Sequence, residues 1–327
     1  MAGERNDAAP ARLSQQGIIV LRISHRLKVF LGFTIICILW GSSWAAVKIG
    51  IELFPPLLSL AIRFTLAGMV LGSIVFIKHL SIPMEKKFWT LVLIMSSTSF
   101  TVPFVLIYWG QLRVGSGLAS VLFATYPFWV ALVSHFLLPN EKITPVRIIG
   151  IVIGFLGVIF IFNNGFSTMS IGMFYCMAAI IAGSIIQAFG LVFLRRLGDT
   201  VHPVTLNFCS MSFSAIPLFA ASLILEEYSH LFFNARSLGS IFYLSIFCTV
   251  ITFVIYFWLV KYVEAVILSL SAFITPVIAV VIGIVFLGEK ITSTVYLGSI
   301  LVLLGVAFAT TSDLIGFYRQ KVKNEIR

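Results

Sequence analysis

Long apolar runs alternate with short polar segments along almost the whole chain. Most of the runs contain about 20 residues, the length at which an α-helix spans the hydrocarbon core of a bilayer. The pattern predicts an all-α polytopic membrane protein with ten transmembrane helices, at residues 29–50, 57–77, 88–110, 116–138, 145–163, 170–194, 203–225, 237–260, 265–287 and 293–316. Residues 148–194 contain no charged side chain and are too long for one crossing, so the turn signal at Asn163–Gly165 is expected to divide them.

Composition supports the membrane assignment. Of the 327 residues 60% are hydrophobic and 10% are charged, whereas soluble domains carry about 25% charged residues. The net charge of +10 sits in short loops and tails, so it indicates cytoplasmic loops of a membrane protein rather than a nucleic-acid partner. The four cysteines all lie in apolar runs and are typical of small buried hydrophobic residues. We therefore expect no metal and no cofactor.

The positions of Lys and Arg predict the topology. If both termini are cytoplasmic, nearly all basic residues fall in cytoplasmic segments, and Lys48, Arg113, Arg236 and Lys290 are the external ones. This bias is the positive-inside pattern of multi-pass proteins. We expect a protein of the cytoplasmic (inner) membrane with both termini in the cytoplasm.

One phrase, Glu-Lys-Ile-Thr, occurs twice, at Glu141 and at Glu289, each time between two apolar runs. Pro127 and Pro276 are separated by nearly the same interval, so the two halves read as copies of one five-helix unit. Because five is odd, the copies must face opposite ways in the membrane, as in many secondary transporters. The predicted organisation is a cytoplasmic tail (1–28), a first repeat (29–163), a second repeat (169–316) and a basic cytoplasmic tail (317–327).

These repeated motifs resemble the drug/metabolite transporter superfamily and, within it, the EamA family of ten-helix carriers. The resembling segments are WGSSWAAVKIG at Trp40–Gly50, YPFWVALVSHFLLPNEKIT at Tyr126–Thr144, and GEKIT at Gly288–Thr292. The resemblance implies a central cavity lined by the first, third, fourth, sixth, eighth and ninth helices. Substrates in such a family are diverse, so the resemblance does not name a ligand.

Aromatic and polar side chains on three helices are candidates for substrate binding. Trp40, Ser43 and Trp44 share a helical face by their spacing, with ordinary packing as the alternative. Ser99 lies in the mid-membrane stretch SSTSFT, where hydroxyl groups also hold helices together. Gln187 stands in the second copy where Trp40 stands in the first, so the tryptophan is not duplicated.

Two matched prolines, Pro127 and Pro276, lie near the middles of the fourth and ninth predicted helices. A proline frees the carbonyl four residues earlier, and matched helix breaks in the two halves of a transporter point to its substrate site. Tyr126 and Thr275 adjoin the prolines and would add hydroxyl groups. A simple packing kink is the alternative.

Three cations are further candidates. Arg63 lies inside the second predicted span, where a charge is costly and often functional. Its partner is expected to be a substrate carboxylate, Glu52 or freed helix carbonyls. Lys48 and Arg195 are repeat equivalents that would make the two mouths of the cavity electropositive, with snorkelling and positive-inside anchoring as the alternatives.

Glu141 and Glu289 are interpreted as structural turn residues, with a gating ion pair as the alternative. Thr144 and Thr292 follow them and are predicted to be helix N-caps. No Asp or Glu lies in the middle of a predicted span. This counts against a pump for organic cations and leaves proton coupling unexplained.

The sequence favours a secondary transporter that moves small polar organic metabolites, amino acids or related zwitterions or anions, by alternating access. One alternative is an uptake carrier for a larger adenine- or sugar-containing metabolite. Another is a membrane scaffold or receptor that transports nothing. The nucleotide-binding motif GxxxxGK[ST] and the hydrolase motifs GxSG and HExxH are absent from the sequence, so no enzyme activity is expected. The expected partners are a small-molecule substrate and the lipid bilayer.

Overall fold

The computed structural model describes residues 9–52, 54–138, 143–163, 170–197, 201–229, 234–260, 262, 268 and 271–325. In these residues the chain forms helices joined by turns, without a strand. The helices of the first half are α1 (Ala9–Ile51), α2 (Pro56–Ile77), α3 (Lys86–Met95), η1 (Ser96–Thr101), α4 (Val102–Gln111), α5 (Ser116–Phe123), α6 (Tyr126–Leu137) and α7 (Pro145–Asn163). Those of the second half are α8 (Ile171–Leu197), α9 (Pro203–Leu225), α10 (Ala235–Ser245), η2 (Ile246–Ile251), α11 (Thr252–Val260), α13 (Ser271–Leu287) and α14 (Ser293–Glu325).

The described part of the chain contains 8 helical segments that are long and apolar enough to cross a membrane. Two shorter apolar helices, Ser271–Leu287 and Ser293–Ala309, accompany them. Large apolar side chains such as Phe76, Phe136 and Leu225 stay exposed on the outside of the bundle, as expected where lipid is the solvent. The protein is therefore a multi-pass helical membrane protein.

The third and eighth predicted helices each contain a π-helical turn at their middle. In the first half α3 runs through η1 into α4, and in the second half α10 runs through η2 into α11. A π-helical turn widens the helix and is frequent at functional sites. Neither π-helical turn was predicted from the sequence.

The fourth predicted helix is broken, whereas the described part of the ninth, Ser271–Leu287, is continuous. Pro127 lies in the first turn of α6, and the chain leaves α5 through Ala124 and Thr125 before α6 begins. Pro276 lies inside α13, which continues past it without interruption. The two matched prolines therefore have different effects on their helices, although their matched positions predicted the same effect for both.

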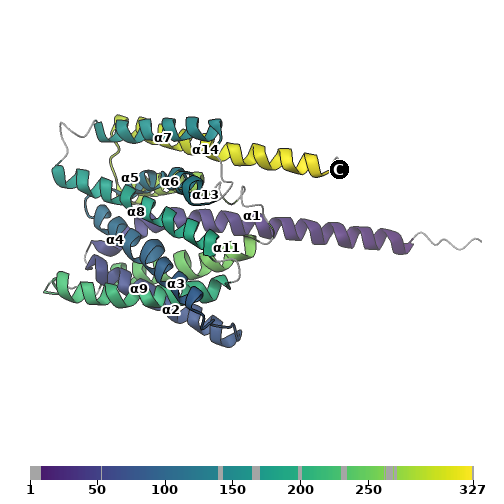
Figure 1. The fold of residues 1–327 in the computed structure, drawn as a ribbon, viewed down its shortest axis with the longest axis horizontal. Coiled ribbons are helices and arrows are strands. Elements are labelled where there is room, and N and C mark those ends of the chain that lie inside the picture. The colour runs from purple at the N-terminus through teal and green to yellow at the C-terminus, as the bar shows by residue number, and fades with distance from the viewer. Residues whose placement is uncertain are drawn as a thin grey trace, which may run out of the picture.

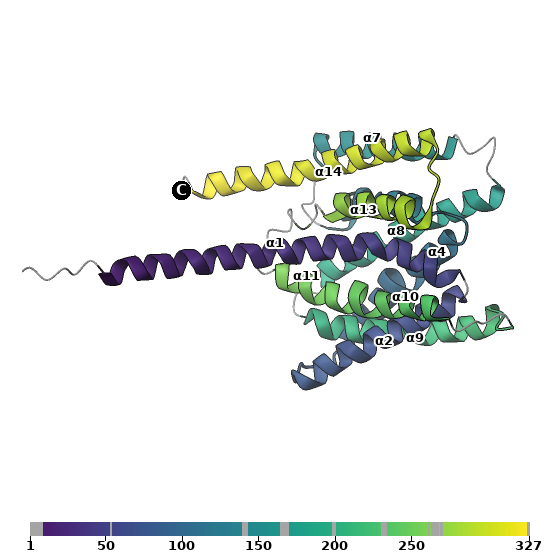
Figure 2. The ribbon, with the colours of Figure 1, turned by 180° about the vertical axis from the view of Figure 1, so that it is seen from behind.

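Both ends of the described chain extend beyond the bundle. α1 begins at Ala9 and α14 continues to Glu325, so helix takes in much of the two predicted tails. The two extensions leave the bundle on the same side (Figures 1 and 2). We call the opposite side, where α1 ends and α2 and α5 begin, the distal end.

Two helix pairs flank the bundle, α7 with α14 and α2 with α9 (Figure 1). Glycines allow α7 and α14 to approach each other closely, because a Cβ on Gly157 would lie 2.7 Å from the carbonyl oxygen of Gly298. Gly150 and Gly305 meet backbone to backbone further along the same crossing. Small residues at such crossings let membrane helices pack closely.

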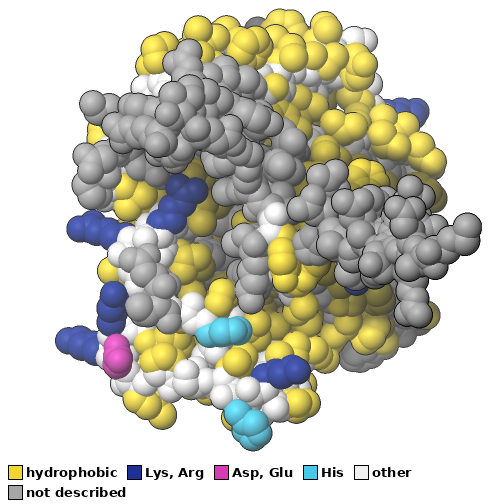
Figure 3. Space-filling model, turned by 90° about the vertical axis from the view of Figure 1, so that its right-hand side faces the viewer, with side chains coloured by type: hydrophobic (Ala, Val, Ile, Leu, Met, Phe, Trp, Pro, Cys, Tyr) yellow, Lys and Arg dark blue, Asp and Glu magenta, His cyan; other side chains and the backbone are white. Residues whose placement is uncertain are grey.

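The end that carries the termini is basic. Figure 3 shows Lys and Arg predominating over Asp and Glu on the part of this face drawn in colour. The exposed cations near this end include Lys78, Lys86, Lys87, Arg195 and Arg196.

Candidate functional site

An aromatic cluster brings together three of the predicted binding residues. The Trp40 ring lies 5.8 Å from that of Tyr256 on α11, and the Trp44 ring lies 5.4 Å from that of Phe123 on α5. Phe123 in turn stacks on Tyr126, with ring centroids 5.8 Å apart and an interplanar angle of 7°. The cluster therefore joins α1 to the fourth and eighth predicted helices.

All five of these aromatic side chains remain partly exposed, so they keep accessible surface beyond their contacts with one another. Rings of this kind hold apolar or planar parts of a ligand, and the Tyr hydroxyl groups can also make hydrogen bonds.

The hydroxyl candidates divide into two groups. The Ser43 hydroxyl donates to the Trp40 carbonyl at 2.7 Å, and the Thr275 hydroxyl donates to the Ser271 carbonyl. Both side chains remain partly exposed, so their oxygens can still accept a hydrogen bond. Ser99 is buried against Gly190 of α8, which fits the helix-holding alternative better than substrate contact.

Gln187 connects the second half to the first π-helical turn. Its Nε2 donates to the carbonyl oxygen of Ser99 at 3.4 Å, and the side chain is partly exposed. A π-helical turn leaves carbonyl groups without their usual partner, and Gln187 satisfies one of them. The remaining amide oxygen can accept from a ligand.

Arg63 is buried, with 5% of its surface exposed. Its Nε and one terminal nitrogen each donate to the Thr249 hydroxyl at 3.2 Å, and the other donates to the Tyr108 hydroxyl at 3.3 Å. The guanidinium also lies 5.0 Å from the centre of the Phe104 ring. Within the described part of the chain these neutral groups are its partners, so no carboxylate balances its charge.

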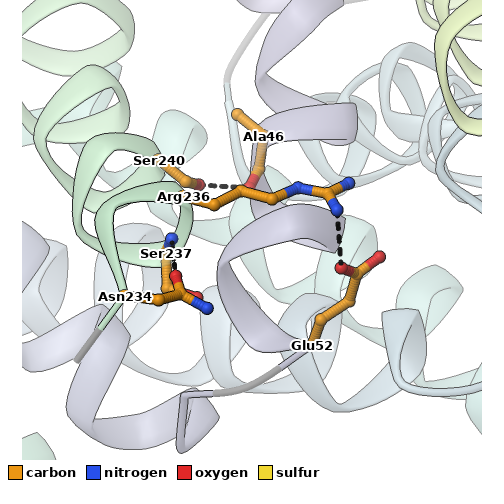
Figure 4. Close-up of polar contacts among 6 residues, drawn as sticks. All are labelled: Ala46, Glu52, Asn234, Arg236, Ser237 and Ser240. Atoms are coloured by element: carbon orange, nitrogen blue, oxygen red, sulfur yellow. Dashed lines mark hydrogen bonds and ion pairs between the residues drawn. The ribbon is translucent and has the colours of Figure 1, made fainter. Parts of the chain in front are cut away.

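Glu52 does not bind Arg63, contrary to one of the sequence-based alternatives. It forms an ion pair with Arg236 at 3.8 Å, at the distal end between α1 and α10 (Figure 4). The same contact region includes a hydrogen bond from the Ser240 hydroxyl to the Ala46 carbonyl (Figure 4). Asn234 caps α10 by accepting from the Ser237 N–H group. Glu52 therefore belongs to the closure of the distal end.

Lys48 and Arg195 lie at opposite ends of the bundle. Lys48 is half-buried at the distal end, where its Nζ donates to the carbonyl oxygen of Gln111 at 2.6 Å. Arg195 is exposed in the last turn of α8 and interacts electrostatically with Tyr126 and Tyr256 of the aromatic cluster.

The structure describes one of the two Glu residues of the repeated phrase. Glu141 lies outside the described residues. Glu289 accepts hydrogen bonds from the N–H groups of Ser116 and Gly117, at the start of α5, instead of pointing into solvent. The predicted N-caps are confirmed, because Thr144 accepts from Arg147 N–H and Thr292 from Val295 N–H.

Sequence reasoning missed two polar side chains that the structure brings into contact with other helices. Thr249 lies in η2 and binds Arg63, and Glu226 accepts from the N–H groups of Leu57 and Leu58 at the start of α2. No spacing rule could have identified them, because each acts on a residue more than a hundred positions away.

A described chain with 8 long apolar helical segments defines the class of multi-pass membrane proteins. A family model described as EamA-like transporter family matches the chain twice, over residues 27–163 and 174–311. The chain belongs to this family.

Curated relatives support the same assignment. The chain is 28% identical over 296 residues to the uncharacterized transporter YoaV of Bacillus subtilis, covering 90% of this chain and 100% of that protein. It is 26% identical to the uncharacterized inner membrane transporter YedA of Escherichia coli, covering 89% and 93%. A solved crystal structure shares the fold with a TM-score of 0.63 at 19% identity, covering 86% of this chain and 96% of that one.

Proposed function

We propose that this protein is a secondary transporter for small polar organic metabolites, namely amino acids or related zwitterions or anions. The observations that carry the proposal are the partly exposed aromatic cluster and the buried Arg63, whose partners among the described residues are neutral. Trp40, Trp44 and Tyr126 would hold the apolar part of the solute, and Arg63 would attract its carboxylate.

Alternating access follows from the organisation that we propose for the chain. It consists of ten spans in two inverted five-helix repeats, with both termini in the cytoplasm and the distal end outside. Rocking of one repeat against the other would expose the central site to each side in turn. The repeated match to one family model and the π-helical turns at equivalent places in both halves support two copies of one unit.

Thermal stability of the purified protein in detergent, measured against a metabolite library, tests the substrate class. A ligand at 100 times its dissociation constant stabilises the folded state by about 2.7 kcal/mol. We expect amino acids or related acids to raise the melting temperature. Stabilisation by adenine- or sugar-containing compounds alone would favour the larger-metabolite alternative, since aromatic rings also stack on bases.

The sidedness is tested by labelling in intact cells. Single cysteines at Arg113, Arg236 and Lys290 should react with a membrane-impermeant maleimide, whereas a cysteine at Arg147 should not. Labelling only at Arg147 would reverse the proposed orientation.

A further inference from the structure

Glu289 is turned back onto the bundle by the residue before it. α13 ends at Leu287, and Gly288 has a φ of +65°, a left-handed conformation that glycine adopts without strain. The N–H of Glu289 then donates to the carbonyl oxygen of Gly283 at 3.0 Å. The turn that the sequence places outside the membrane thus directs a carboxylate to the inside of the distal end.

The carboxylate occupies a close-fitting cradle at the start of α5. Its oxygens accept from the N–H groups of Ser116 at 2.5 Å and Gly117 at 3.0 Å, where the helix dipole favours an anion. A Cβ on Gly115 would lie 2.9 Å from a Glu289 oxygen, and a Cβ on Gly283 would lie 2.5 Å from it. Glycines on both helices therefore leave room for this side chain and for no further atoms.

An unused hydroxyl group lies beside the carboxylate. Ser116 is fully buried, and its Oγ has no hydrogen-bond partner in the described part of the chain. A Cβ on Gly283 would meet both this Oγ, at 3.0 Å, and the Glu289 oxygen, so the two groups share one space. An ionised carboxylate does not need this hydroxyl, whereas a protonated one needs an acceptor for its O–H.

Other charges surround this contact. The charged or titratable groups near the distal end of α5 are Lys48 and Glu52 from α1, Arg113 from the α4–α5 connection, Cys176 from α8, and Lys290 from the same turn. Lys48 interacts electrostatically with Glu289 and with Glu52, while Glu52 is already paired with Arg236. Lys48 therefore places a positive charge near the carboxylate that binds α5.

We propose that Glu289 is the proton-binding residue that couples this transporter to a proton gradient and latches its distal end. Ionised, Glu289 ties the start of α5 to the turn between α13 and α14. Protonated, it exchanges its two charge-assisted bonds from Ser116 and Gly117 N–H for one neutral hydrogen bond from its O–H to the Ser116 Oγ, and this weaker contact lets α5 separate from α13. The proposal rests on the proposed transport function, and it provides the carboxylate that the apolar spans lack.

The break in the fourth helix makes such a movement mechanically possible. α5 is a separate helix of 8 residues, and Ala124 and Thr125 connect it to α6. This connection is the point about which α5 would pivot relative to α6. Thermodynamic linkage sets the direction of the pH effect. Because protons bind the open form more tightly than the latched form, lowering the pH opens the distal end.

Glu226 is a matched control for Glu289. It also caps a helix, by accepting from Leu57 N–H at 2.6 Å and Leu58 N–H at 2.9 Å. The Ser222 hydroxyl already donates to it, and α9 and α2 pack side by side along the bundle (Figures 1 and 2). Glu226 therefore holds two helices that stay together, and its removal should not release the distal end.

Distances between two spin labels in lipid nanodiscs test the latch without any substrate. The labels are placed at Leu112 and Ser293, both exposed, after the four native cysteines are replaced by alanine. Lowering the pH from 8 to 5 should increase the population of a longer distance about tenfold, a typical coupling between sites. Glu289→Gln should show the longer distance at both pH values, and Glu289→Asp should keep the pH response. Glu226→Gln should behave like the wild type.

Distances that do not change with pH, or an equal effect of Glu226→Gln and Glu289→Gln, would overturn the latch.

A second measurement in proteoliposomes tests coupling to the proton gradient, with a radiolabelled amino acid mixture as the probe. The ratio of proton-gradient-driven uptake to counterflow should fall about tenfold in Glu289→Gln and remain unchanged in Glu226→Gln. An unchanged ratio in Glu289→Gln would exclude the coupling role. Absence of wild-type counterflow would instead contradict the proposed function, while the spin-label distances would still decide the latch.

Discussion

The second helix of each half packs against the π-helical turn of the other half, but the two contacts differ in charge. In one, Arg63 on α2 binds Thr249 in η2. In the other, Ser210 takes the corresponding position on α9. It is fully buried, and its hydroxyl has no hydrogen-bond partner among the described residues. Ser214, one turn later, pairs with Ser96 of η1 at 2.9 Å. The same packing thus holds a cation in one half and a neutral hydroxyl in the other.

This difference shows how a duplicated unit acquires a specific function. Packing needs small polar groups against the widened π-helical turn, and serine is sufficient for that. A buried arginine carries a desolvation cost that a serine does not, although its guanidinium binds Thr249 and Tyr108. We infer that Arg63 binds the solute, whereas the corresponding contact in the second half serves only helix packing.

The largest effect is expected from neutralising that cation. Arg63→Gln should raise the apparent KM for an anionic or zwitterionic solute by roughly 10- to 100-fold, since hydrogen bonds to charged groups contribute about 1.5–3 kcal/mol. Arg63→Lys should retain part of the affinity. Uptake kinetics in proteoliposomes provide the measurement.

Ser210→Ala is the matched change in the second half. Removing an unpaired buried hydroxyl should change stability by less than about 0.5 kcal/mol and leave KM unaltered. Equal losses in the Arg63 and Ser210 variants would show that both positions serve packing alone.

An intermediate effect is expected from the prolines, which also differ between the halves. Pro127→Ala should join α5 to α6, stabilising that helix by up to about 3 kcal/mol while slowing transport. Pro276→Ala should have little effect on the rate, because α13 already continues through Pro276. Melting temperature and maximal rate, measured on both variants, check this. The expectation is wrong if the two variants slow transport equally.

The smallest effects are expected at the two mouths. Lys48→Gln should raise the apparent KM for solute on the outer side, and Arg195→Gln the KM for solute on the inner side. Exposed charges contribute up to about 1 kcal/mol, so each change should be about fivefold or less and should weaken at high salt. Oriented vesicles give both KM values. Identical KM values in both variants and the wild type would show that Lys48 and Arg195 do not attract solute.

The apolar pattern predicted the helices well because lipid imposes a length and a polarity on each span. α2 and α9 begin and end within one residue of the expected bounds, and Thr144 and Thr292 act as the N-caps that their chemistry predicts. Membership of the EamA-like family was also evident from the repeated motifs.

The contacts between halves could not be predicted in the same way. Glu289 was interpreted as a turn residue from its neighbours, yet its carboxylate binds α5, which lies far away in sequence. Glu52 was one candidate partner of Arg63 but pairs with Arg236. Both contacts depend on how the helices cross in space, and the local spacing of residues along the sequence does not reveal those crossings.

Solute counterflow in proteoliposomes tests the central claim most directly. Purified protein is reconstituted with an unlabelled amino acid mixture inside, and the entry of a trace of the same labelled mixture is followed against protein-free liposomes. An alternating-access transporter should accumulate label transiently and saturably, and Arg63→Gln should reduce this. Label entry equal to that of protein-free liposomes for amino acids and related acids would contradict the account.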